Sequence, residues 1–490
     1  AADYTHRTEF DDLGRTVKIT PAVRDLSVAE RDEFKAGPGH VSTFAYDSPH
    51  ASLDAAAGHA NHTIGRLTSA VSPAATTITG FNEFGLPTVG SQRLNDLPGL
   101  SGLSGIGDTL QTAVSFDETG LQPTTIQYSA RNSAGQTVFT GPAVHASGFD
   151  RDGAPTATSI DLGSRGTMAI AVDRNAAGAV TARRTNTGGL SEFSNPLTRY
   201  NRDRYGRLTS QETVAFGEND TEIQRYKQTL DYYDNGQISQ IKEQLGDTTQ
   251  PEYTTDYSYN HRGELSSAWG NDYAASLYIR ASGRLDYAGV FDLTLAQPAQ
   301  APIPGRRITS RFANYRYQDP AAGGDPLRLT ALHVDDETED GLDLATYLYD
   351  EAGNTTNRSV TNPDNTATTY TQRWDGPSSL RKVTNSSTGQ TETYFHDAGT
   401  RVAAIRKNAD GTINSVRRYF GAQEIVYTPG QQPAYRQNLT LAGDTIGRID
   451  GDAETGTLEH YTTTVQGHHV LALAAQDAAT RRVTRYGAFG

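Results

Sequence analysis

Cysteine is absent from the 490-residue sequence, and methionine occurs only once. Without cysteine the chain has no disulfide, no thiol nucleophile and no cysteine-based zinc site. Long apolar runs are also missing: the longest plain stretch covers residues 470–475. A helix that crosses a bilayer needs about 20 consecutive apolar residues. The sequence therefore predicts a chain without a membrane span.

Positive charge is scarce as well. Lys and Arg number 43 against 57 Asp and Glu, which leaves a formal net charge of −14. Because binding to phosphates needs a basic surface, this balance argues against nucleic acid as a partner. The mean hydropathy of −0.58 indicates a polar chain. Neither a P-loop nor a dinucleotide-binding glycine pattern occurs, and we expect no cofactor.

Glycine and tyrosine are abundant, with 48 and 25 copies. Tyr, Thr and Val favour strands, whereas Gly, Asn and Asp favour turns. This composition is typical of hairpins joined by tight turns.

One short pattern recurs along the chain: an aromatic residue, then Asp or Asn, then two residues and a Gly. The stretch YLYDEAGNTTNRS, residues 347–359, contains one copy. The copies are Phe10-Asp11 with Gly14, Phe81-Asn82 with Gly85, Phe116-Asp117 with Gly120, Phe149-Asp150 with Gly153, Tyr259-Asn260 with Gly263, Tyr349-Asp350 with Gly353, and a degenerate copy at Phe395 with Gly399.

Each part of this pattern has a physical role in a chain reversal. The aromatic ring packs at the end of a strand. The Asp or Asn side chain accepts hydrogen bonds from nearby backbone N–H groups, and Gly supplies the positive φ that the turn needs. A single hairpin is marginal in water, so many successive hairpins imply one continuous antiparallel sheet. We predict an all-β fold in which these turn residues are structural.

Three segments interrupt the strand pattern. Residues 28–34 are expected to form a short helix, with Ser27 as its cap and Glu30 completing a capping box. Residues 86–112, rich in Gly, Leu and Ser, and residues 296–342, rich in Pro, Gly and acidic residues, are interpreted as insertions or long loops. The repeat resumes after each of them. Residues 1–490 are therefore predicted to form a single segment.

The motif Tyr349-Asp350-Glu351-Ala352-Gly353-Asn354 resembles the YD repeat of the RHS (rearrangement hot spot) family. Three later stretches resemble the family's C-terminal motifs in the same order, with Phe395 in place of a Tyr and His396 in place of an Asp. They are FHDAGTRVAAIRK (395–407), RRYFGAQEIVY (417–427) and GHHVLALAAQDAATRRVTRYGAFG (467–490). Residues 343–490 are thus similar to RHS C-terminal repeats, as found in the B and C components of bacterial toxin complexes.

The resemblance implies a spiralling sheet that forms a hollow shell or part of one, since strand twist makes a long sheet coil. It further implies a secreted bacterial protein that encapsulates or delivers a C-terminal toxin or effector domain. The expected partners are that cargo or other segments of the same polypeptide. The family's self-cleaving Asp-Pro-x-Gly element is not matched at Asp319-Pro320 or Asp325-Pro326. We therefore expect a non-enzymatic shell segment.

Two other functions stay open. One is an extracellular protein that binds carbohydrate or acts in adhesion. The other is a polysaccharide-degrading lyase, in which a Tyr or His removes a proton. No pattern fixes which residues would converge on such a site, and we predict no catalytic residues.

Possible metal ligands are interpreted as ordinary surface residues. His59 with His62, and the adjacent His468 and His469, lack the further ligands of a zinc site. The acidic run 450–456 resembles part of a calcium loop, but a hairpin turn explains it better. The acidic run 335–341 is expected to be a solvated loop. We predict no metal site.

Overall fold

The structure is a computed structural model of the whole chain. It describes residues 7–21, 26–35, 40–50, 62–95, 97, 100, 109–132, 134–186, 196–216, 221–246, 249, 251–270, 273–279, 285–292, 311–319, 324–334, 342–362, 364–375, 379–397, 399–441, 444–452, 455–465, 468–474 and 481–483.

Nearly all regular structure in these residues is β-strand, as predicted. The helices are α1 (Val28–Phe34) and the 3-10 turn η1 (Gly163–Arg165). The strands are β1 (Arg7–Phe10), β2 (Thr16–Thr20), β3 (Ser42–Tyr46), β4 (Leu67–Val71), β5 (Ala75–Phe81), β6 (Pro87–Leu94), β7 (Thr109–Phe116), β8 (Pro123–Arg131), β9 (Thr137–Thr140), β10 (Ala143–Phe149), β11 (Pro155–Asp161), β12 (Thr167–Arg174), β13 (Val180–Asn186), β14 (Leu197–Arg202), β15 (Leu208–Phe216), β16 (Glu222–Tyr232), β17 (Ile238–Leu245), β18 (Glu252–Tyr259), β19 (Leu265–Gly270), β20 (Tyr273–Ile279), β21 (Leu285–Asp292), β22 (Arg311–Tyr317), β23 (Leu329–Val334), β24 (Leu342–Tyr349), β25 (Thr355–Thr361), β26 (Ala367–Trp374), β27 (Leu380–Asn385), β28 (Thr391–Asp397), β29 (Thr400–Lys407), β30 (Ile413–Phe420), β31 (Gln423–Tyr427), β32 (Ala434–Leu441), β33 (Asp444–Asp450), β34 (Thr457–Val465), β35 (His468–Ala474) and β36 (Arg481–Val483).

Among the described strands, consecutive strands pair with one another except β9 and β10, and every pairing is antiparallel. The one branch is at β8, which pairs through its C-terminal half with β9 and through its N-terminal half with β10. The described strands therefore form a single continuous sheet. No pairing between them joins β1 to β36, so the sheet is open.

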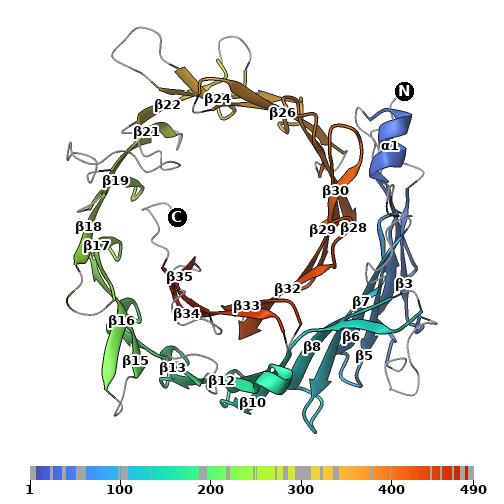
Figure 1. Cartoon of the computed structure of the whole chain (residues 1–490), viewed down its shortest axis with the longest axis horizontal. Helices are drawn as coiled ribbons and strands as arrows, with labels where there is room; N and C mark the ends of the chain where they lie inside the picture. The colour runs from blue at the N-terminus through green and yellow to red at the C-terminus, as the bar shows by residue number, and fades with distance from the viewer. Residues whose placement is uncertain are drawn as a thin grey trace.

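The sheet curls into a spiral that surrounds a central opening (Figure 1). Its C-terminal part returns to lie inside its N-terminal part, so that two layers overlap. We call β5–β16 the outer layer, β28–β35 the inner layer, and β17–β26 the single-layer wall. The expectation of a spiralling, shell-like β-sheet is confirmed, as an open structure.

Hydrophobic cores form where the two layers overlap. One cluster joins Ile170 and Met168 of β12 to Leu439, Ile449 and Leu458 of the inner layer, each at most 1% exposed. A second cluster packs residues of β28–β31 on the start of β5, and a third packs β31 on β7–β9. The inner layer thus uses its outward face, and the outer layer its inward face, to exclude water.

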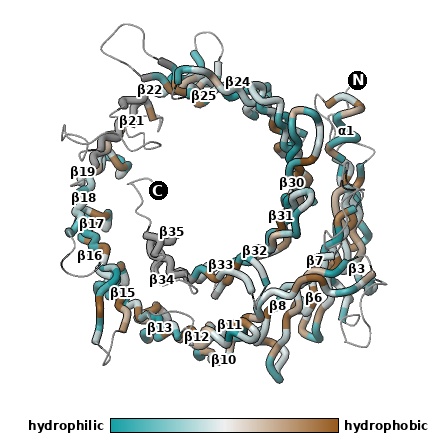
Figure 2. Tube along the Cα trace, in the orientation of Figure 1, coloured by the Kyte–Doolittle hydropathy of each residue, from teal (hydrophilic) through white to brown (hydrophobic). Residues whose placement is uncertain are grey.

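The single-layer wall is stabilised differently. Among its described residues no hydrophobic core cluster occurs. Polar side chains pair across its neighbouring strands: Gln240 with Asp256, and Ser359 with Thr369. Hydrophilic and hydrophobic residues are interspersed along the wall (Figure 2). A sheet without a second layer has polar neighbours on both faces, which accounts for the Thr-, Gln- and Tyr-rich composition.

The strand register identifies the face that points into the spiral. Ile170 and Val172 point toward the inner layer, and residues directly opposite in successive strands share their face. Followed from strand to strand, this face includes Thr185, Thr198, Thr213, Tyr226, Tyr253, Tyr257, Tyr347 and Tyr370. The inward face of the wall is therefore rich in tyrosine.

The short helix α1 occurs where the sequence predicts it. Ser27 and Glu30 form the complete capping box, and Phe34 is fully buried. The helix is attached to a distant part of the sheet, because Lys382 Nζ donates to Glu33 Oε1 over 2.9 Å.

The two expected insertions contain more strand than the sequence suggested. Strand β6 pairs with β5 and β7 and takes up residues 87–94 of the segment 86–112. Strands β22 and β23 lie within 296–342, while the acidic run 335–341 lies outside the described residues. Gly, Ser and Pro lower intrinsic strand preference, but pairing on both sides overrides it. No described helix has the length and apolar character needed to cross a membrane.

We expect the overlap cores to set the stability of the spiral. Replacing Ile170 with Ala should lower the free energy of unfolding by about 2–5 kcal/mol, because a cavity remains between the layers. The matched control is Leu348→Ala in the single-layer wall, where the side chain is 61% exposed. This control should change stability by less than about 0.5 kcal/mol. Urea unfolding of both variants measures the difference; equal losses would contradict it.

Candidate functional site: the rim of repeat turns and the inner face

All of the repeat turns lie along one rim of the sheet. Each joins a strand to its successor in the antiparallel order, and strands that run in the same direction end at the same rim. The branch at β8 preserves this order, because β9 and β10 both run opposite to β8. We call this edge the turn rim. Residues that are more than 300 positions apart in the sequence therefore lie along the same edge of the sheet.

The turn at Tyr349–Asn354 illustrates the local chemistry. Asp350 Oδ1 accepts a hydrogen bond from the backbone N–H of Asn354 over 2.8 Å, and Asp350 N donates to Asn354 O over 2.9 Å. Gly353 has a φ of 89°, in the left-handed region that favours glycine. The carboxylate thus closes the turn and the glycine permits the reversal.

The other copies repeat this geometry. The Asp or Asn side chain accepts from backbone N–H groups at Asp11, Asn82, Asp117, Asp150 and Asn260. The glycines have φ between 71° and 81°, and they are Gly14, Gly85, Gly120, Gly153 and Gly263. The aromatic positions are less uniform: Phe10 is 60% exposed, while Phe81, Phe116, Phe149 and Tyr259 are half-buried.

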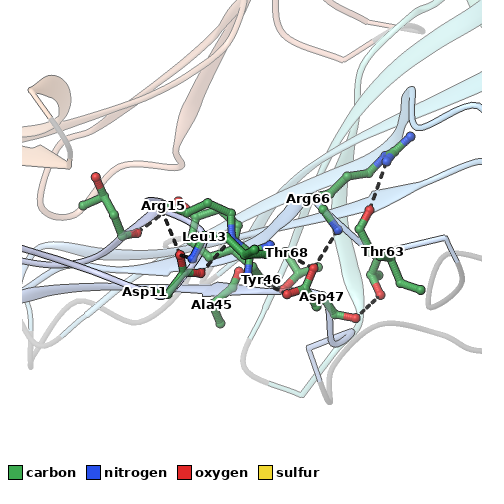
Figure 3. Close-up of polar contacts among 12 residues, drawn as sticks. Asp11, Leu13, Arg15, Ala45, Tyr46, Asp47, Thr63, Arg66 and Thr68 are labelled. Carbon is green, nitrogen blue, oxygen red and sulfur yellow. Dashed lines mark hydrogen bonds and ion pairs between the residues drawn. The ribbon is translucent and has the colours of Figure 1, made fainter.

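Successive turns are also bonded to one another, which the sequence pattern did not reveal. Arg15, directly after Gly14, forms a bidentate ion pair with Asp47 in the next turn, at 2.9 and 2.7 Å (Figure 3). Arg328 donates to the backbone carbonyls of Asp350 and Glu351. Gln237 donates to Gly263 O over 2.7 Å. In these three cases the residue beside a turn thus reaches the neighbouring turn.

The Arg15 cluster shows how strongly these contacts favour charged forms. Arg15 also bonds Asp11, and its guanidinium lies 4.5 Å from the ring centre of Tyr46. The hydrogen bonds from Arg15, with the N–H of Gly65, lower the pKa of Asp47 to about 2. Asp47 has a φ of 67°, so a non-glycine residue holds this turn in the left-handed region.

The aromatic residue at the strand end forms a second link along the turn rim. Its side chain donates to the carbonyl of the first residue of the preceding strand. The pairs are Tyr46 to Thr16, Tyr232 to Leu208, Tyr317 to Leu285, Tyr349 to Leu329, and Trp374 to Thr355, at 2.7–3.0 Å. A phenylalanine cannot make this bond. The choice of Tyr or Trp over Phe was the signal in the sequence that could have revealed it.

The copy at Phe395 departs from the common geometry. Phe395 is 1% exposed and belongs to the core between the layers. Its neighbour Asp397 accepts from Thr77 Oγ1 of β5 over 2.9 Å, and burial raises the pKa of Asp397. Burial, with the nearby cations of Arg381 and Arg401, lowers the pKa of His396 to about 4. Gly399 retains a positive φ of 87°. This hairpin therefore serves as a contact between layers.

A ladder of alternating charges covers the inward face of the inner layer. The register places Glu392 opposite Arg406, Glu424 opposite Arg436, and Arg436 opposite Asp450. Ion pairs run along the ladder from Arg417 to Glu424, Arg436, Asp450, Arg448 and Glu459, at 3.0–3.7 Å. This face points toward the central opening (Figure 1). Paired charged groups therefore line this side of the central opening.

Other candidate residues are not brought into a common site. His62 is exposed with a φ of 60°, while His59 lies outside the described residues. The run at Asp450 forms the hairpin turn between β33 and β34, where Asp452 Oδ1 accepts from Thr455 N. No cluster of three or more His, Asp or Glu suited to a metal occurs among the described residues.

Comparison with known proteins gives no family and no curated relative. No family model and no curated protein matches the chain. Similar solved structures include a TcdB2–TccC3 complex, at 14% identity over 96% of this chain and with a TM-score of 0.25. They also include the Tc holotoxin pore of Photorhabdus luminescens, at 12% identity over 96% of this chain and with a TM-score of 0.26.

A porin-like protein from Bacteroides uniformis is similar over 45% of this chain and 89% of its own, at 13% identity and a TM-score of 0.19. The chain spans about a third of the length of the two toxin-complex chains, at 32% and 31%. These neighbours are β-rich proteins. At such TM-scores the likeness carries no argument, so the fold assignment rests on the strand pairing itself.

Substitution of the turn glycines should be destabilising because of their positive φ. Gly353→Ala should cost about 1–3 kcal/mol of stability, because alanine is strained at its φ of 89°. Gly90→Ala in β6 is the control, since its added Cβ would meet only Phe420 at an ordinary 3.6 Å. Thermal unfolding of the two variants tests this. Equal melting temperatures would show that the left-handed turn is not a constraint.

The hydroxyl link along the turn rim should be measurable by removing one oxygen. Tyr349→Phe leaves the ring in place but removes the bond to Leu329 O, and should cost about 0.5–1.5 kcal/mol. Tyr205→Phe is the control, because that side chain is 67% exposed. Urea unfolding monitored by the fluorescence of Trp269 and Trp374, the latter two strands from β24, reports the change. No difference between the two variants would contradict the link.

Proposed function

We propose that this chain is a wall segment of a secreted bacterial β-shell that encloses a polypeptide cargo. The cargo is a toxin or effector domain, or another segment of the same polypeptide. The observation that supports this proposal most is the single-layer wall. A sheet usually buries one face against a second layer, yet β17–β26 curve around the central opening without a core of their own among the described residues (Figure 1).

The chemistry of the inward surface suits an unfolded polypeptide. The wall offers the partly exposed tyrosines Tyr253, Tyr257 and Tyr347, which combine an apolar ring with a polar hydroxyl. The inner layer offers the charge ladder, whose groups are already paired with one another. Such a surface can contact cargo polypeptides of many sequences weakly, and it does not favour one particular cargo structure. It therefore favours containment over specific recognition.

The mechanism of containment is exclusion. Consecutive strands are joined by unbroken main-chain pairing, so the wall is a barrier made of backbone hydrogen bonds. The contacts along the turn rim tie each hairpin to the next and oppose local opening. Proteases cut chains that are exposed and flexible, so a segment held inside the wall is shielded from them.

A protease-protection experiment tests the proposal. A disordered reporter peptide is fused either after Gly490 or before Ala1. Strands β34 and β35 lie inside the spiral, whereas β1 and β2 belong to its outside (Figure 1). We expect the C-terminal reporter to be cleaved several-fold more slowly than the N-terminal one under native conditions. Unfolding the shell in urea should abolish the difference.

Two outcomes separate the interpretations. Equal cleavage of the two native fusions would contradict containment. Protection that persists in the Leu348→Ala control but falls in Ile170→Ala would show that the overlap of the two layers maintains it.

A further inference from the structure

A groove opens on the rim opposite the repeat turns, where the two layers separate. Its volume is about 870 Å³, within the range of about 300–1,000 Å³ that is usual for ligand sites. One side is formed by β9 and by the end of β11 at Asp161. The other side is formed by the start of β32 and by the turn between β33 and β34.

One edge of β9 is unpaired and faces this groove. In the described structure β9 pairs only with β8. Gly141 N donates to Tyr128 O over 2.8 Å, and Phe139 lies opposite Ala130. Because bonding alternates along an antiparallel strand, the N–H and C=O of the intervening Thr140 point away from β8. Thr137, Val138 and Thr140 are all exposed and line the groove.

The missing neighbour of β9 is the continuation of β11. Ala143 pairs with Asp161, the last residue of β11. Beyond it the chain turns away into η1, because Gly163 N donates to Asp161 Oδ1 and Leu162 N donates to Gly166 O. Had β11 continued, its next residues would have paired with Thr140. The groove therefore has the place and direction of one further strand.

The floor and the charges of the groove indicate which kind of ligand it can bind. Phe139 and Tyr435 stack across the two layers with ring centres 4.0 Å apart, giving an apolar floor. Asp161, Asp450 and Asp452 line the groove with Arg436, three negative charges against one positive charge. Asp450 is paired with Arg436 and Arg448. Asp161 is exposed and forms no ion pair within the described residues.

We propose that this groove binds an extended, basic polypeptide segment by strand addition to β9. The segment would lie in line with β11 and exchange main-chain hydrogen bonds with Thr140, as in other cases where a peptide joins a sheet edge. An apolar side chain would cover the ring of Tyr435, and a lysine or arginine on the opposite face would approach Asp161. This inference does not depend on the containment function.

The test uses the full chain and fluorescein-labelled hexapeptides, with binding followed by fluorescence anisotropy. The first probe alternates lysine and valine. The second has the same side chains, with alternate backbone nitrogens methylated so that strand pairing is blocked. We expect the first probe to bind, and the methylated one to bind at least tenfold more weakly. Equal binding of the two would show attraction by the net negative charge alone and would overturn the proposal.

Variants then locate the site. Thr140→Pro removes the outward N–H without removing a bond to β8, whereas Thr140→Val retains that N–H. Affinity should fall several-fold in the proline variant and stay unchanged in the valine variant. Asp161→Asn, which keeps the oxygen that accepts from Gly163, should weaken binding of the lysine probe and lower its salt dependence.

Three results would count against the proposal. They are unchanged binding to Thr140→Pro, tighter binding of a hexapeptide in which glutamate replaces lysine, and displacement of the lysine probe by a neutral oligosaccharide. The methylated probe on the unaltered protein decides the question even if the proline variant fails to fold.

Discussion

Main-chain pairing between consecutive strands is the interaction on which the whole structure depends. Because the described strands pair with their neighbours in sequence, apart from β9 and β10, which both pair with β8, every hairpin extends the same sheet and its turns fall alternately on two rims. The repeat turns gather on one rim for this reason alone. Once they are adjacent, a side chain such as Arg328 can reach the turn at Asp350. Local pairing thus creates the longer-range contacts.

Strand twist then makes the sheet coil. Coiling lets the sheet bury apolar side chains between two of its own layers. In a single layer of a polar chain, few apolar side chains can be shielded from water. Where the spiral overlaps itself, the outward face of β32–β34 meets the inward face of β12, and Ile170 and Leu439 become fully buried. The hydrophobic contribution is concentrated in that overlap. The rest of the wall depends on main-chain pairing, on polar side chains such as Gln240 and Asp256, and on the turn rim.

The sequence was sufficient to predict the all-β fold, the turn chemistry at residues such as Asp350 and Gly353, and helix α1, because each depends on residues close together in the chain. The overlap could not be predicted, since it depends on the cumulative twist of many strands. Strand β6 was missed because Pro87 and Gly90 have weak strand preference. The charge ladder was missed because Arg436 and Asp450 become neighbours only once the register is known.

The contrast between Phe395 and Tyr349 shows how one pattern serves two purposes. Both are aromatic residues near the end of a strand, followed by a turn with a glycine of positive φ. Tyr349 lies in a single layer, where its ring cannot be fully covered and its hydroxyl bonds to Leu329 O. Phe395 lies in the overlap, where a hydroxyl would need a partner between two layers. In these two copies, the aromatic residue thus differs with the number of layers around it.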